Sequence, residues 1–274
     1  MLIPGVAHSS ALSDDIRYNV YLPEGYDGSG ERYPSIYLLH GRGGRAEDWR
    51  EFLPDLDDLI DSGAVPPLIA IMPDAPWGRR AGFYVDSLFT GHAIEAAFTR
   101  DLISHIDGSL RTIAGRRSRA VAGYSMGGAG AVRFVSAHPD LFSAAIALSP
   151  ASYVPLPPTG SSAREFGAFG AGGRPFDASR YEQLGYPRAL ARFTGDLPVT
   201  LFIGAGDAEY AQPLAEDFDQ DLDQVAATLH NHARRTPGVT SSLRIYGGGH
   251  GWDTWRQGMR EGLQVLGRVL GGQP

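Results

Sequence analysis

The sequence contains no cysteine and no lysine. The absence of cysteine excludes disulfides, thiolate nucleophiles, zinc–thiolate sites and iron–sulfur clusters. All 24 basic residues are therefore arginine, and against 31 acidic residues they leave a net charge of −7. A negative surface repels nucleic acid and anionic membranes, so we expect neither as a partner.

Long hydrophobic runs are also missing. No apolar stretch approaches the roughly 18 residues that a membrane span needs. Residues 1–15 have no basic region and only a short apolar start, which is not typical of a signal peptide. We therefore expect a cytoplasmic protein, although a secreted chain trimmed of its leader would look the same. The oligomeric state stays open.

Short apolar runs alternate with amphipathic stretches along the 274 residues. Most runs are continuously apolar, which is typical of strands buried on both faces of a parallel sheet. The pattern predicts one α/β domain over residues 1–274, with a central, mostly parallel sheet flanked by helices. The expected strands are residues 35–40, 67–73, 119–125, 143–150, 198–207 and 241–248, with an alternating, half-exposed edge strand at 17–23.

Helices are predicted where apolar residues recur at helical spacing. This spacing occurs between residues 94 and 106, between 214 and 222, and from Trp255 to Leu270, where two glycines end the helix. Residues 151–185 show no sustained period and are rich in Gly, Pro, Ser and Phe. A loop this long is usually functional or disordered, and we expect a cap-like excursion.

The strongest catalytic motif is Gly123-Tyr124-Ser125-Met126-Gly127. It joins an apolar strand to a helix rich in small residues, which is the strand–turn–helix context of a nucleophilic serine. Glycines on both sides relieve crowding in a strained turn. Ser125 is therefore the predicted nucleophile.

A serine hydroxyl needs a base to take its proton. His250 is the candidate, because it follows a strand and three glycines and would reach the same sheet edge as Ser125. His138 lies just behind the motif and is expected to cap or pack. His230 and His232 lie two apart on a helix and are interpreted as solvated surface.

The base in turn needs an orienting acid, which in α/β-hydrolases lies between the serine and the histidine in the chain. Asp207 ends the strand 198–207 and is the favoured acid. Glu209, two residues later, is the alternative. Asp253 follows His250 and breaks the expected order.

An ester hydrolase also needs backbone N–H groups that stabilise an oxyanion. One is expected from Met126, directly after the nucleophile. The other is expected from the glycine-rich loop after an early strand, with Arg42 favoured and Gly41 as the alternative. This loop lacks the frame of a phosphate-binding loop.

Two further patterns are interpreted as surface. Four alternating acidic residues resemble a calcium loop but lack its glycine and its final glutamate; they are Asp217, Asp219, Asp221 and Asp223. Arg79 and Arg80 either bind a substrate carboxylate or stay in water, and surface is the default.

Several motifs in order along the chain resemble the esterase D group of α/β-hydrolases. They are HGRGG with Trp49 downstream, PDAPWGRRAGFYVDS, FTRDLISHID, GYSMGG and HGWDTW. That group includes feruloyl and acetyl-xylan esterases, S-formylglutathione hydrolases, siderophore-ester hydrolases and mycolyltransferases. The resemblance implies a triad of Ser125, Asp207 and His250, with Met126 and Arg42 as oxyanion donors.

The same resemblance implies substrate contacts from residues within these motifs, namely Tyr124, Trp252, Tyr84 and Trp77. Trp255 matches a second tryptophan beside the family histidine and is equally well explained as helix core. The chain lacks the His-Gly-Leu-Thr-Cys loop of S-formylglutathione hydrolases, and it has Gly127 where mycolyltransferases have alanine. These departures favour the carboxylesterase branch.

The expected function is therefore a serine carboxylesterase acting on short-chain acyl, acetyl or feruloyl esters through an acyl-enzyme. Its partner would be a small-molecule ester, with no metal and no organic cofactor. An acyltransferase with the same triad is the alternative, and a non-catalytic binding module on this scaffold is a third hypothesis.

Overall fold

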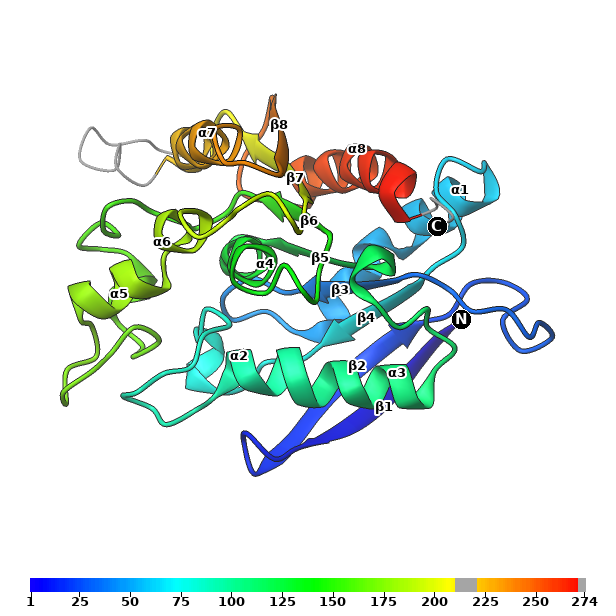
Figure 1. Ribbon diagram of the computed structural model, residues 1–274, viewed down its shortest axis with the longest axis horizontal. Coiled ribbons are helices and arrows are strands. Elements are labelled where there is room, and N and C mark those ends of the chain that lie inside the picture. The colour runs from blue at the N-terminus through cyan, green and yellow to red at the C-terminus, as the bar shows by residue number, and fades with distance from the viewer. Residues whose placement is uncertain (210–220, 271–274) are drawn as a thin grey trace.

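The computed structural model describes residues 1–209 and 221–270, and within them eight strands form one sheet (Figure 1). The strand order is β1-β2-β4-β3-β5-β6-β7-β8. Strands β1 and β2 are antiparallel to their neighbours, and all the other pairs are parallel. The bounds are β1 Leu2–Ser9, β2 Asp14–Tyr21, β3 Ser35–Leu39, β4 Ile69–Pro73, β5 Arg119–Tyr124, β6 Ala144–Leu148, β7 Val199–Gly206 and β8 Val239–Tyr246.

Helices connect the strands and cover both faces of the sheet. The α-helices are α1 Leu53–Asp61, α2 Ile94–Ala96, α3 Ile103–Ser109, α4 Met126–Ala137, α5 Ala178–Leu184, α6 Tyr186–Leu190, α7 Leu222–Ala233 and α8 Trp252–Leu270. A π-helical segment, η3 Ala97–Leu102, joins α2 to α3, and the short 3₁₀ segments are η1 Ala46–Phe52, η2 Gly78–Arg80, η4 Arg116–Ser118 and η5 Ser162–Arg164.

The central strands are buried on both faces, as their continuous apolar runs predicted. Every residue of β3, β4, β5 and β6 is buried. One core lies between the sheet and the helices α3, α4 and α7, and a second core lies between the sheet and η1, α1 and α8 (Figure 1). The predicted α/β architecture, with a mostly parallel sheet between helices, is confirmed.

The N-terminal edge of the sheet differs from the prediction. The strand expected at 17–23 is β2, and it is not the edge, because β1 pairs along its whole length from Leu2↔Tyr21 to Ser9↔Asp14. Strand β1 contains Pro4 and Gly5, which weaken a strand signal and are tolerated at an edge. The alternation in β2 therefore reflects one face that is partly exposed, not a missing neighbour.

The helical predictions are confirmed where the structure describes the chain. The apolar residues four apart between 94 and 106 lie on α2, η3 and α3, where the wider π turn keeps them on one face. The predicted C-terminal helix is α8. The predicted helix over 214–222 lies mostly outside the described residues, as do Asp217 and Asp219 and the two glycines after Leu270.

The segment 151–185 is mostly irregular, but it contains η5 and ends in α5. It packs on the α4 side of the sheet through Tyr153, Phe169 and Tyr181, which are all buried in that core. The Tyr181 hydroxyl donates to the Tyr153 carbonyl at 3.0 Å. In the described ranges, no helix is both long and apolar enough to cross a bilayer.

Candidate active site

Ser125 lies on a sharp turn between β5 and α4. Its backbone has φ 56° and ψ −120°, a strained conformation for a residue with a side chain. The flanking glycines allow this turn because they have no Cβ, so neighbouring backbone segments can lie in close contact with them. A Cβ on Gly123 would lie 2.2 Å from the Gly127 carbonyl oxygen, and one on Gly127 would lie 2.1 Å from the Leu39 carbonyl oxygen. The G-x-S-x-G pattern is therefore a steric requirement of this turn.

His250 meets Ser125 at the carboxyl edge of the sheet. It lies in the loop between β8 and α8, and its Nε2 is 3.0 Å from the Ser125 Oγ. Its Nδ1 is 2.5 Å from the Glu209 Oε2. Because an ionised carboxylate only accepts hydrogen bonds, Nδ1 carries the hydrogen and Nε2 is free to accept one from Ser125. The predicted serine and histidine are thus brought together in the orientation that a general base needs.

The carboxylate at His250 belongs to Glu209 and not to Asp207, the acid favoured from the sequence. The Asp207 side chain is exposed and accepts the Gly248 N–H at 3.0 Å, so it holds the glycine loop that carries His250. The Glu209 side chain is 1% exposed and turns back under the imidazole. Both residues follow β7 and precede His250, so neither chain order nor placement at the end of the strand distinguishes the acid from its neighbour.

The buried Glu209 carboxylate has further donors on its other oxygen. Its Oε1 accepts the Ser149 hydroxyl at 2.7 Å and the Gly206 N–H at 2.6 Å. Buried carboxylates are stable only when they are paired and hydrogen-bonded, and this one is. Ser149 was not identified from the sequence, because a serine directly after a buried strand carries no motif of its own.

The glycine-rich loop after β3 lies against the nucleophile. A Cβ on Gly41 would be 3.4 Å from the Ser125 Cβ. His40 fixes the base of the loop: it is fully buried, its Nδ1 donates to the Gly41 carbonyl at 2.8 Å, and its Nε2 accepts the Ala75 N–H at 3.0 Å. Burial lowers the pKa of His40, so the neutral ring that this pattern requires is favoured.

Arg80, interpreted as surface from the sequence, also holds this loop. Its guanidinium pairs with Asp74 at 2.6 Å and donates to the Gly44 carbonyl at 3.0 Å. Its neighbour Arg79 is exposed, as expected.

The two expected oxyanion donors flank Ser125. Met126 is the first residue of α4, and the first N–H groups of a helix have no acceptor within it. Arg42 is an exposed residue of the loop beside Ser125. An oxyanion site needs N–H donors beside the nucleophile, and this role of Met126 and Arg42 stays a prediction.

An aromatic cluster adjoins the catalytic residues. Tyr124 stacks on Trp255, with ring centroids 4.3 Å apart, and lies 5.4 Å from the half-buried Trp252. The Tyr124 hydroxyl donates to Asp48 at 3.0 Å, and burial raises the pKa of Tyr124. Trp49 is fully buried beneath this cluster. Trp252 is therefore the member of the cluster that is partly exposed beside the site.

Three of the four expected substrate contacts are buried in this fold, and the first is Tyr124, which is 5% exposed with its hydroxyl bonded to Asp48. Tyr84 is 1% exposed, and its hydroxyl donates to the His40 carbonyl at 3.0 Å. Trp77 is 8% exposed, and its indole N–H donates to Asp14 at 3.2 Å. All three side chains are buried with their polar atoms engaged, which is at odds with a role in contacting substrate.

The other histidines after Ser125 lie away from the nucleophile. His138, at the end of α4, pairs with Glu95 at 2.8 Å, so it packs as expected. Burial alone would raise the pKa of Glu95, but the bonds from His138 and Arg133 lower it. His230 and His232 lie on α7; His230 is half-buried and 3.0 Å from the Ser241 hydroxyl, whereas His232 is exposed.

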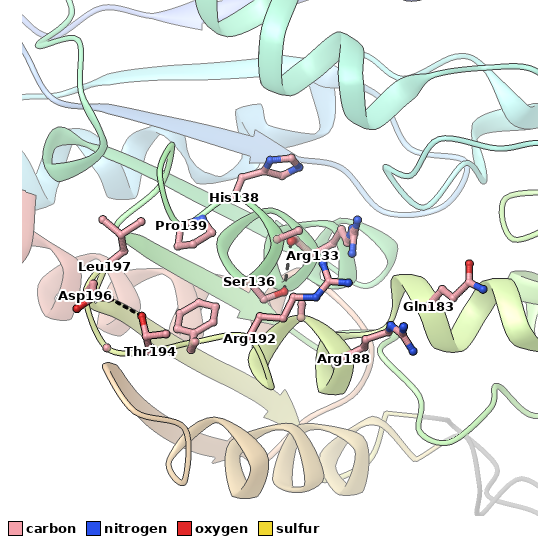
Figure 2. A pocket seen from close by; sticks show the side chains of 14 residues that line it. Arg133, Ser136, His138, Pro139, Gln183, Arg188, Arg192, Thr194, Asp196 and Leu197 are labelled. Atoms are coloured by element: carbon pink, nitrogen blue, oxygen red, sulfur yellow. Dashed lines mark hydrogen bonds between the residues drawn. The ribbon is translucent and has the colours of Figure 1, made fainter.

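A cavity of about 370 Å³ opens between α4 and α6 (Figure 2). Its charged lining includes Arg133 on α4, Arg188 on α6 and Arg192 just after α6, all of which are labelled in Figure 2. None of the residues around Ser125 lines it. Among the described residues, no three His, Asp or Glu side chains gather closely enough to hold a metal ion.

Comparison with known proteins identifies a family for most of the chain and curated relatives for half of it. The model of a family described as putative esterase matches residues 9–266. An esterase of Mycobacterium tuberculosis (strain ATCC 25618 / H37Rv) is 38% identical over 140 residues, which cover 50% of this chain and 29% of the relative. An endo-1,4-beta-xylanase/feruloyl esterase of Xylanibacter ruminicola is 35% identical over 146 residues, which cover 50% of this chain and 20% of the relative. The matches thus span less than a third of these curated relatives.

Solved structures show the same fold. A ferulic acid esterase has a TM-score of 0.80 at 24% identity, over 98% of both chains. An S-formylglutathione hydrolase from Agrobacterium tumefaciens has a TM-score of 0.74 at 17% identity, over 98% of this chain and 95% of the other. The architecture is the α/β-hydrolase fold that the sequence resemblance implied.

Proposed function

The chain belongs to the putative esterase family, and on that premise we propose that it is a serine carboxylesterase acting through an acyl-enzyme. The proposal is supported above all by the continuous hydrogen-bonded series from Ser125 through His250 to Glu209. A nucleophile, a base and an orienting acid in this geometry are the requirements of acyl transfer through serine.

In the first half of the reaction, the Ser125 Oγ attacks the ester carbonyl carbon while the His250 Nε2 takes its proton. The buried Glu209 carboxylate holds the imidazole tautomer and stabilises the imidazolium. The N–H groups of Met126 and of Arg42 or Gly41 bind the oxyanion. As the tetrahedral intermediate collapses, the C–O bond to the alcohol breaks and His250 gives its proton to the leaving alcohol.

In the second half, a water molecule replaces the alcohol. His250 takes a proton from this water as it attacks the acyl carbon, and a second tetrahedral intermediate forms. The bond to Ser125 then breaks, His250 returns the proton to Oγ, and the carboxylic acid leaves. The residues at the site accomplish this cycle with no cofactor.

The proposed substrate is a small-molecule ester with a short-chain, acetyl or feruloyl acyl group. A feruloyl acyl group is supported by the names of one curated relative and one structural neighbour. The partly exposed ring of Trp252, beside Tyr124 and the nucleophile, would give an apolar wall for the acyl chain.

The test is a set of initial hydrolysis rates for wild type and Ser125→Ala. The substrates are nitrophenyl acetate, butyrate and octanoate, together with methyl ferulate. We expect turnover that falls about 10⁴-fold or more in the variant, because the nucleophile is lost. Ser136→Ala is the matched control, since within the described part of the chain this buried hydroxyl on α4 bonds only to its own helix, at the Val132 and Arg133 carbonyls.

Turnover that is equal in wild type and Ser125→Ala on every ester would overturn the proposal. Ester product that appears when an acceptor alcohol is added, in place of free acid, would reassign the protein to acyl transfer. If Ser125→Ala abolishes turnover as expected, the relative rates of wild type on the four esters give the size of the acyl site.

A further inference from the structure

We propose that Ser149 and Trp255 are positioning residues, which lock the Glu209 carboxylate in the rotation that presents Oε2 to His250. The inference rests on the proposed function and extends it by two side chains. Neither side chain is expected to touch substrate. Both act through Glu209, because hydrogen bonds run from Trp255 on α8 through Ser149 to its carboxylate.

The contacts form a series of four hydrogen bonds. The Trp255 indole N–H is 3.0 Å from the Ser149 Oγ, and this hydroxyl is 2.7 Å from the Glu209 Oε1. The carboxylate continues through Oε2 to the His250 Nδ1 at 2.5 Å, and Nε2 continues to the Ser125 Oγ at 3.0 Å. The series thus joins α8, the end of β6, the end of β7 and the start of α4.

The direction of these bonds follows from the chemistry of the groups. An indole N–H only donates, so the Ser149 Oγ must accept from Trp255. The hydroxyl hydrogen of Ser149 is then directed to the carboxylate, which only accepts. Trp255 therefore fixes the rotation of the Ser149 hydroxyl, and Ser149 fixes one oxygen of Glu209.

The carboxylate needs this restraint because the last torsion of a glutamate is soft. Torsions that end in a planar group are broad and roughly two-fold, so side-chain packing alone does not define them. Oε1 is bound by both Ser149 and the Gly206 N–H. With Oε1 held by two donors, Oε2 is the oxygen that faces His250.

The backbone at Ser149 is built for this contact. Ser149 is fully buried with φ 42°, in the left-handed region that side chains rarely adopt, and its N–H donates to the Gly204 carbonyl on β7 at 2.6 Å. Such strain persists only where the surroundings impose it. Trp255 is held equally firmly, stacked on Tyr124 and edge-on to His250 at 5.1 Å.

Four variants test the inference: Ser149→Ala, Ser149→Gly, Trp255→Phe and the double variant Ser149→Ala/Trp255→Phe. The control is Ser143→Ala, at the other end of β6, where the buried hydroxyl has no partner within the described ranges. For each variant we would measure kcat and KM on nitrophenyl acetate, the thermal midpoint, and the rate at which a fluorophosphonate labels Ser125. The labelling needs no turnover, so it reports activation of the serine even when an ester is a poor substrate.

We expect Ser149→Ala to lower kcat and the labelling rate about 10- to 100-fold with little change in KM, because one charge-assisted bond to the acid is lost. Ser149→Gly should lose the same amount of activity while its thermal midpoint stays at or above that of Ser149→Ala, since glycine relieves the positive φ. Trp255→Phe should lose less, about threefold to tenfold, because Ser149 still donates. The double variant should be no slower than Ser149→Ala, since the indole acts only through the hydroxyl.

Labelling of Ser149→Ala and Ser149→Gly at the wild-type rate per folded molecule would overturn the inference. So would a kcat loss in the double variant equal to the product of the two single losses. Failure of the proposed function has a different signature. In that case wild type would not hydrolyse any ester, while the labelling rates would still rank the variants and decide the role of Ser149 and Trp255.

Discussion

Replacing Glu209 with glutamine tests which carboxylate orients the imidazole. The Glu209 Oε1 accepts from both Ser149 and Gly206, so a glutamine must keep its carbonyl oxygen at that position. Its NH₂ group then faces the His250 Nδ1 in place of Oε2. Because an amide NH₂ only donates, Nδ1 must become the acceptor and the hydrogen must move to Nε2, the atom that has to accept from Ser125.

This exchange of tautomers gives the expected magnitude. A base with its hydrogen on the wrong nitrogen lowers kcat by about 10⁴-fold in serine hydrolases, or about 5.4 kcal/mol at 1.36 kcal/mol per tenfold. Asp207→Asn is the matched variant, two residues away. Its amide oxygen still accepts the Gly248 N–H, so we expect a change in kcat of less than about threefold.

The assay is steady-state hydrolysis of nitrophenyl acetate, with thermal unfolding to confirm that each variant is folded. A loss of 10³-fold or more in Asp207→Asn, together with near-wild-type kcat in Glu209→Gln, would refute this reasoning and return the acid to Asp207. Equal, small losses in both variants would mean that neither carboxylate orients His250.

Two further predictions concern the loop after β3. Gly41→Ala would place a Cβ 2.6 Å from a carbon of the Tyr124 ring, which is held by stacking on Trp255 and by its bond to Asp48. The loop must then shift, and kcat should fall about 100-fold. Gly30→Ala has open space around its Cβ and should leave kcat unchanged, so equal kcat values for the two variants would contradict the role of this loop. Because burial lowers the pKa of His40, only the unfolded chain takes up that proton as the pH falls below about 6.5. The free energy of unfolding should therefore decrease below that pH, by up to about 1.4 kcal/mol per pH unit, and be flat in this respect above it. The measurement is denaturant unfolding of wild type and His40→Asn between pH 5 and 8. Burial also lowers the pKa of His230, but His230 is present in both proteins, so the difference between them reports His40 alone. Identical pH dependence of the free energy of unfolding would rule out the contribution of His40.

The nucleophile and its base were predictable because local sequence determines their placement. Ser125 needs a turn that only small neighbours allow, and the motif records this requirement directly. His250 follows a strand of a parallel sheet, and all such strands end at one edge. Both signals depend on a few adjacent residues.

The acid and its supporting hydroxyl were not predictable in the same way. Asp207 and Glu209 both follow β7 and precede His250, but the fold exposes Asp207 to bond a glycine N–H and buries Glu209 against the imidazole. Ser149 acquires its role from α8, a segment about a hundred residues away. Long-range packing decides such contacts, and a single sequence records no trace of it.

The edge of the sheet shows the same limit. Strand β2 was recognised by its alternation, but its outer neighbour β1 was not, because Pro4 and Gly5 mask the strand pattern. Tyr84 and Trp77 were assigned to the substrate through family motifs. A motif does not show whether an aromatic side chain faces substrate or is buried, and here Tyr84 bonds to the His40 carbonyl and Trp77 to Asp14 at the start of β2.

The hydrogen-bonded series also constrains how the molecule can be synthesised and folded. Ser125 and His250 are separated by 125 positions in the chain, and Trp255 lies later still. Contacts this distant form slowly, since a large loop must close before they contribute. A ribosome that has released the chain through Glu209 has already exposed the serine and the acid, but His250, which joins them, follows 41 positions later. The three catalytic side chains can therefore meet only late in synthesis, after β8 and the loop that carries His250 have left the ribosome.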